Sequence, residues 1–215
     1  MVKVLNCKTK KEGNMLKFIK YYALEIYTVL SMFILMSAGI IGDLSVIQKF
    51  TLVYIFLFIL HEWEEMKYPG GFADLIAKMI GVHINEEMKR ASRIPTGILL
   101  LSFTVVPFVF SKYPFAILPL AFLGLFEGLV HLLAIRLFKT KKFYSPGFVT
   151  AQMQFVVSVI LFIYLIQNRI LSGPEYLLGG LIMLVCFIIM QKTITMMIGY
   201  KYSNLFKNIK KQWQK

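Results

Sequence analysis

Six long apolar stretches constrain this chain more than any other feature, at residues 22–41, 46–60, 96–110, 115–138, 148–166 and 176–198. Inside a bilayer every backbone polar group needs an internal partner, so such stretches cross as α-helices. The 215 residues are 58% hydrophobic and only 16% charged, and no soluble domain this small hides so much apolar surface. We therefore predict an all-α, polytopic membrane protein with a bundle of about six transmembrane helices. A soluble enzyme, a disordered tail and a disulfide scaffold are excluded.

The positions of the lysines and arginines test this count independently. Of the 24 basic residues, 21 fall in one set of alternate segments and 3 in the other. This bias is expected of an even number of helices with both termini in the cytosol. We predict a multi-pass protein of the cell membrane. The net charge of +13 then reflects contact with anionic lipids at the cytosolic face of the bilayer, and not nucleic-acid binding.

The predicted organisation has three parts. Residues 1–21 form a basic cytosolic segment, residues 22–199 the six-helix transmembrane domain, and residues 200–215 a basic cytosolic tail. A purine-rich coding pattern before Met15 raises the hypothesis that translation starts there instead of at Met1. Apolar side chains recur at helical spacing between the second and third spans, which predicts a cytosolic helix along the membrane surface. They are Phe72, Leu75, Ile76, Met79 and Ile80.

A charged motif, His61-Glu62-Trp63-Glu64-Glu65, stands at the cytosolic end of the second predicted span. On a helix, Glu64 and Glu65 flank His61 on one face. The macrodipole disfavours negative charge at a helix C-terminus, so a positive partner is expected. That partner is a metal ion, or Arg and Lys from neighbouring helices. Imidazole and carboxylate ligands would suit zinc, iron or manganese.

A second pair of polar residues, Glu127 and His131, lies four residues apart in the fourth predicted span. His131 precedes Arg136 by five residues, which places it about as deep as His61. Gly128 between the pair lets another backbone or a ligand approach closely. We expect one shared site, with His61, Glu65, Glu127 and His131 as the metal ligands. The alternative is that both histidines are satisfied bundle residues and the carboxylates pair with cytosolic lysines.

A third stretch, His83-Ile84-Asn85-Glu86-Glu87, repeats the same letters. Here we predict that Asn85 caps a helix whose first turn holds Glu86 and Glu87, where the dipole favours acids. His83 as a third inward-facing imidazole is the less favoured alternative.

At these residues the chain resembles the bacterial HXXEE-domain family of integral membrane proteins. The likeness covers about residues 55–155 and includes the motif at 61–65 and His131 followed by Tyr144-Ser145-Pro146-Gly147. The family is functionally uncharacterised and suspected to be enzymatic, so the resemblance implies enzymatic function without naming a reaction. Ser-Pro-Gly by itself indicates a rigid turn into a helix. That leaves the Tyr144 hydroxyl as a catalytic candidate near the mouth of the site.

The leading hypothesis is a metal-dependent membrane enzyme with its site in the cytosolic leaflet. It would act on a lipid-like or membrane-embedded hydrophobic substrate, with Glu64 as general base or further ligand and hydrolysis favoured over oxidation. The zinc-protease pattern H-E-x-x-H is not met, because Glu65 stands where its second histidine belongs. The alternatives are a transporter, exporter or immunity-type protein with an ion or proton site, and a structural membrane partner. Oligomeric state stays open.

Overall fold

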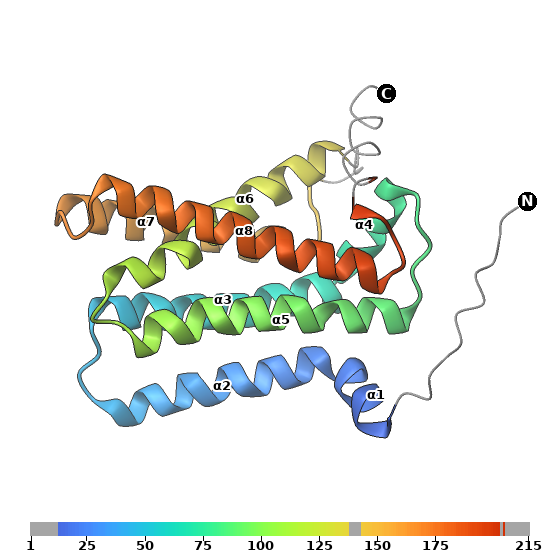
Figure 1. The fold of residues 1–215 in the computed structure, drawn as a ribbon, viewed down its shortest axis with the longest axis horizontal. Coiled ribbons are helices and arrows are strands. Elements are labelled where there is room, and N and C mark those ends of the chain that lie inside the picture. Colours follow the sequence, from blue (N-terminus) through green and yellow to red (C-terminus); the bar gives the residue numbers. More distant parts are fainter. Residues whose placement is uncertain (1–12, 138–142, 203, 205–215) are drawn as a thin grey trace, which may run out of the picture.

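The computed structural model describes residues 13–137, 143–202 and 204, and no strand occurs among them. The chain forms helices joined by short turns (Figure 1). In chain order the elements are α1 (Asn14–Tyr21), α2 (Ala23–Ile41), α3 (Val46–Met66), α4 (Phe72–Ile80), α5 (Glu86–Val109), the 3-10 turn η1 (Pro114–Ile117), α6 (Leu118–Leu137), α7 (Phe148–Gln167) and α8 (Gly173–Met197).

Six of these helices are long and apolar enough to cross a membrane, namely α2, α3, α5, α6 with its preceding 3-10 turn, α7 and α8. The predicted fold class and number of spans are therefore confirmed. The long helices run lengthwise through the molecule, and the short helices α1 and α4 lie at the end where α3 and α8 finish (Figure 1). We call this the motif end of the bundle, because residues 61–65 lie there.

The third span begins ten residues earlier than the sequence predicted, at Glu86 instead of residue 96. The Asn85 side chain accepts a hydrogen bond from the Met88 amide at 2.8 Å, so the predicted cap is confirmed. The capped turn, however, is the first turn of the membrane-crossing helix itself. Pro95 lies inside this helix, and the sequence-based boundary fell beside it because proline usually interrupts a helical pattern. In a bundle, neighbouring helices allow such a proline.

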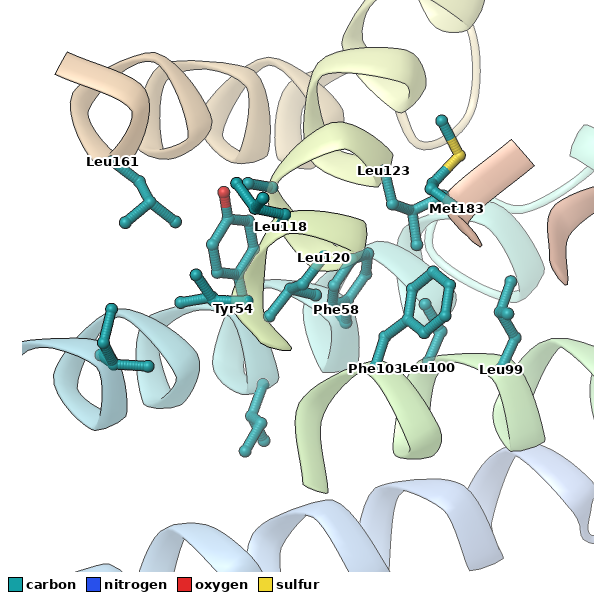
Figure 2. Close-up of a cluster of buried hydrophobic side chains, with 14 of the residues drawn as sticks. Tyr54, Phe58, Leu99, Leu100, Phe103, Leu118, Leu120, Leu123, Leu161 and Met183 are labelled. Atoms are coloured by element: carbon teal, nitrogen blue, oxygen red, sulfur yellow. The ribbon is translucent and has the colours of Figure 1, made fainter. Parts of the chain in front are cut away.

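The helices are held together by an apolar core that runs between α3, α5, α6, α7 and α8. In Figure 2 the α5 side chains Leu99, Leu100 and Phe103 lie opposite Leu123 of α6 and Met183 of α8. Tyr54 and Phe58 of α3 complete the middle of the core, and both are almost fully buried. Large side chains fill this region. They fix the positions of α3 and α6 relative to each other about one helical turn away from the motif, towards the middle of the bundle.

Two glycines on α6 set the close approach of α7. A Cβ at Gly128 would lie 2.6 Å from Phe155 Cβ, and one at Gly124 would overlap Ser158. The Gln152 side chain also donates to the Gly128 carbonyl at 2.9 Å. Small residues four apart are a common way for membrane helices to pack backbone to backbone. The neighbour that the sequence allowed at Gly128 is therefore α7, and this packing brings Glu127 and His131 beside the start of α7.

The predicted surface helix between the second and third spans is present as α4, flanked by Gly71 and Gly81 with positive φ of 96° and 71°. Most of the two predicted basic terminal segments, residues 1–12 and 205–215, lies outside the described residues, as does the end of the fourth predicted span at 138.

Candidate metal centre

Four parts of the chain meet around the motif. The last turns of α3 carry His61 and Glu65, and the second half of α6 carries Glu127 and His131. The segment before α7 adds Gly147. Phe72 at the start of α4 stacks on the His131 ring at a centroid distance of 4.7 Å. The predicted meeting of the two histidines occurs: their ring centroids are 5.1 Å apart and their planes nearly perpendicular.

Hydrogen bonding assigns the tautomer of His61. Its Nδ1 lies 2.9 Å from the Thr150 hydroxyl oxygen. That hydroxyl has one proton, which it donates to Glu64 Oε2 at 2.5 Å. Towards His61 the oxygen can therefore only accept, so Nδ1 carries the proton. The lone pair of the imidazole is then on Nε2, the arrangement that metal-binding histidines require.

His131 is held in the same way by another hydroxyl. Its Nδ1 lies 3.2 Å from Ser145 Oγ, which donates to the His131 carbonyl at 3.3 Å. The Nδ1 proton again points at a hydroxyl oxygen, and in the neutral imidazole the lone pair is on Nε2. This Nε2 is buried without a hydrogen-bond partner among the described residues. A buried acceptor without a partner costs about 1–3 kcal/mol, which favours an additional ligand at this atom.

Both Nε2 atoms converge on two carboxylates. His131 Nε2 lies 3.4 Å from Glu65 Oε1 and 3.8 Å from Glu127 Oε2, and the corresponding His61 distances are 3.8 and 3.9 Å. These separations are longer than hydrogen bonds. They are close to the edge of a tetrahedron around a metal, roughly 3.3–3.6 Å for metal–ligand bonds of about 2.0–2.2 Å. His61, Glu127 and His131 thus form a group that could hold a metal ion.

The backbone of Gly147 closes one side of this group. A Cβ there would lie 2.6 Å from His131 Cε1, 2.8 Å from Glu65 Cγ and 2.9 Å from His61 Cε1. The residue also has a φ of +89° and is the N-cap of α7. Glycine is therefore required at this position for two reasons. Its backbone is left-handed, and any side chain would clash with both imidazoles. The turn predicted from Ser-Pro-Gly is present, and it also forms a wall of the site.

Glu64 caps the start of α7 in place of Gly147. A glycine has no side chain to accept the free amides of the first helical turn. The Glu64 carboxylate, from α3, accepts instead from the Val149 amide at 3.2 Å and the Thr150 amide at 3.0 Å. The Tyr144 hydroxyl donates to the same carboxylate at 2.8 Å. Burial and this neighbouring negative charge raise the pKa of the Tyr144 phenol, so it remains a donor.

Arg93 supplies the positive charge expected near the crowded carboxylates. Its Nη1 donates to Glu62 Oε2 at 2.8 Å and to Glu65 Oε2 at 2.9 Å, and the side chain is only 7% exposed. Glu62 and Glu65 thus share one guanidinium, whereas the Glu127 carboxylate lies beside the two histidines. With these three carboxylates ionised and the imidazoles neutral, the formal charge of the group is −2, and a divalent ion would neutralise it.

A cavity of about 220 Å³ opens beside the group and reaches into the bundle. Glu127 faces it, and the Glu127 side chain is 19% exposed, against 8% for Glu65 and 0% for His131. The remaining walls are mainly apolar side chains from α4, α5, α6 and α8. A hydrophobic molecule in this cavity would therefore lie beside His61, Glu65 and Glu127.

The other predicted residues fall at different places. Tyr144 and Glu64 lie behind Thr150, on the far side of the His61 ring from its Nε2. His83 lies exposed in the turn between α4 and α5. Sequence reasoning did not single out Arg93 or Thr150. No local pattern marks them, since each is far in sequence from the group that it contacts.

Comparison with known proteins identifies the same region. A family model described as "Protein of unknown function with HXXEE motif" matches residues 52–162, slightly more than half of the chain. The chain belongs to the HXXEE family. The matched range contains every residue of the metal centre described above, so the predicted resemblance is confirmed. No curated protein and no solved structure matches the chain.

Proposed function

We propose that this HXXEE protein is a metal-dependent membrane enzyme whose site lies in the cytosolic leaflet and hydrolyses a small lipid-like substrate. One observation carries the proposal: hydroxyl groups fix both imidazoles so that their lone pairs meet at buried carboxylates. His131 Nε2 is one of a few buried side-chain atoms without a hydrogen-bond partner among the described residues, and a metal ion would give it one. The metal is zinc, iron or manganese, the ions that suit mixed imidazole and carboxylate ligands.

The ligands are His61, Glu127 and His131, with Glu65 as the fourth. A divalent ion there would supply Lewis-acid polarisation of an ester, amide or phosphoester group. Glu127 lines the cavity and accepts no hydrogen bond from a described residue. Its Oε2 lies at the two histidines, so its other oxygen would be the group best placed to take a proton from an attacking water.

Glu64 and Tyr144 act as positioning residues in this proposal. Among the described residues, the Glu64 carboxylate accepts hydrogen bonds only from the start of α7 and from Tyr144, and through Thr150 these bonds orient His61. The general-base role that the sequence suggested for Glu64 passes to Glu127, because Glu127 lines the cavity and Glu64 does not. Arg93 holds Glu65 in its ionised form from the opposite side.

Element analysis of purified protein in nanodiscs tests the proposal. The parent and the His61→Ala/His131→Ala double variant are compared with His83→Ala, which removes the remaining histidine from an exposed turn. We expect close to one equivalent of metal in the parent and in His83→Ala, and none in the double variant. Zinc would support hydrolysis, and iron would redirect the proposal to oxidation. A folded parent that binds no metal after reconstitution would overturn it, and would favour a proton or ion site.

A further inference from the structure

The cavity beside the metal centre has polar groups on one wall and an apolar floor. The floor lies on the side of the bundle interior, from the level of Glu127 to about one turn deeper. It is built from Phe58, Leu99, Leu100, Leu123, Phe126 and Phe187. Figure 2 shows Leu99, Leu100 and Leu123 facing one another across this region. A ligand with its polar end at the metal centre therefore places its other end among these side chains.

The charges around the cavity favour a neutral polar end. Of the lining cations in the described residues, Arg93 is bound to Glu62 and Glu65. Lys89 is bound to Asp74 at 2.8 Å and Glu86 at 2.6 Å. A divalent ion would only offset the −2 charge of the centre, so an anionic head would add a negative charge that neither Arg93 nor Lys89 is free to balance. Desolvating that charge would be costly. A carbonyl oxygen is a neutral acceptor and does not have this cost.

The volume limits the length of the ligand. An apolar cavity of about 150 Å³ accommodates benzene, with six carbon atoms. In proportion, a cavity of 220 Å³ accommodates about nine non-hydrogen atoms. An eight-carbon methyl ketone is of about this size. A phospholipid with two long chains does not fit.

We propose that the cavity binds one neutral, single-chain carbonyl compound of about nine non-hydrogen atoms, with the carbonyl at the metal centre and the chain on the floor formed by α5, α6 and α8. This names the substrate class of the proposed enzyme and rests on the proposed function only for the placement of the carbonyl. Binding of the chain requires the apolar floor and not the metal.

Photoaffinity labelling in nanodiscs tests the chain site without assuming a reaction. The probe is 2-octanone carrying a diazirine near the end of its chain, and labelled peptides are located by mass spectrometry. We expect saturable labelling of the floor segments around Leu99 and Leu123. Competing 2-alkanones should gain about fourfold in potency per methylene up to about eight carbons and then stop gaining. Octanoate and 2-tetradecanone should compete at least tenfold more weakly than 2-octanone.

Two variants on the same helix provide the matched control. Thr96→Phe places a ring in the cavity, whereas Ile98→Phe places it on the outer face, where Ile98 is 61% exposed. Floor labelling should fall at least tenfold in the first and stay unchanged in the second, with metal content equal in both. Should Thr96→Phe not fold, Phe187→Ala enlarges the floor, and the preferred 2-alkanone should lengthen by several carbons.

The outcomes separate this inference from the proposed function. A parent that binds no metal after reconstitution but still shows saturable floor labelling would refute the metalloenzyme and leave the chain site standing. Bound metal with labelling that is unsaturable, or equal for 2-tetradecanone, would overturn the chain site and leave the metal centre standing. Labelling abolished equally by Ile98→Phe would also overturn the chain site.

Discussion

Replacement of Gly147 by alanine gives the sharpest test of the metal centre. The added Cβ would lie 2.6–2.9 Å from carbons of His131, Glu65 and His61, about 1 Å inside normal contact distance. Overpacking of this kind costs about 1–3 kcal/mol. The left-handed backbone, with a φ of +89°, costs alanine about a further 1–2 kcal/mol. We expect the free energy of unfolding to fall by about 2–5 kcal/mol.

The metal affinity should fall by more than the stability alone explains. The contacted carbons of the two imidazoles must move apart, and displaced ligands typically lower metal affinity about 10- to 100-fold. Gly71→Ala is the control, because Gly71 has a φ of +96° but no heavy atom within 4 Å of its added Cβ. Gly71→Ala therefore has the same kind of backbone strain, close to the metal centre, but its added Cβ contacts no ligand. Competition with a chromophoric chelator measures both affinities. Equal affinities in the two alanine variants would refute the arrangement of the site.

Three further results are expected. Arg93→Ala leaves two buried carboxylates without a partner and should lower the free energy of unfolding by about 3–5 kcal/mol, whereas Arg90→Ala should lower it far less in the same thermal melts. Tyr144→Phe removes one hydrogen bond, so stability should fall by about 1 kcal/mol with metal content unchanged; a more than 100-fold loss of activity at full metal content would instead make Tyr144 a catalytic residue. In a cysteine-free background, a cysteine at the exposed Tyr68 should react only from the cytosolic side and one at Lys112 only from outside, and the reverse pattern would contradict the predicted orientation.

The relation between Glu64 and Gly147 explains why the motif contains so many carboxylates. Gly147 has to lack a side chain because both imidazoles contact it. The amides of α7 then lose their usual cap, and Glu64 replaces it from another helix. Its negative charge, unfavourable at the end of α3, is favourable at the start of α7. Glu62 and Glu65 are balanced separately, by Arg93. Glu64 is thus balanced by the start of α7, whereas Glu62 and Glu65 share Arg93.

Several features of the protein followed from its sequence alone. Apolar stretches of this length can only be helices in a bilayer, so the six spans were predictable from length and composition. The pairing of His61 with His131 was predictable as well, because distance along a helix converts residue number into depth. The Asn85 cap followed from local chemistry. These conclusions depend on local periodicity, which a single sequence contains.

Only the tertiary structure decided which groups complete the site. Arg93, Thr150 and Gly147 are 28 to 89 residues away in sequence from the motif residues that they contact. No periodic pattern reveals such contacts, because they depend on how α5 and α7 are rotated about their own axes. That rotation is set by packing, for α7 by the glycines of α6. The depth of a residue in the membrane therefore follows from the sequence, whereas the rotation of each helix about its own axis is determined by packing against its neighbours.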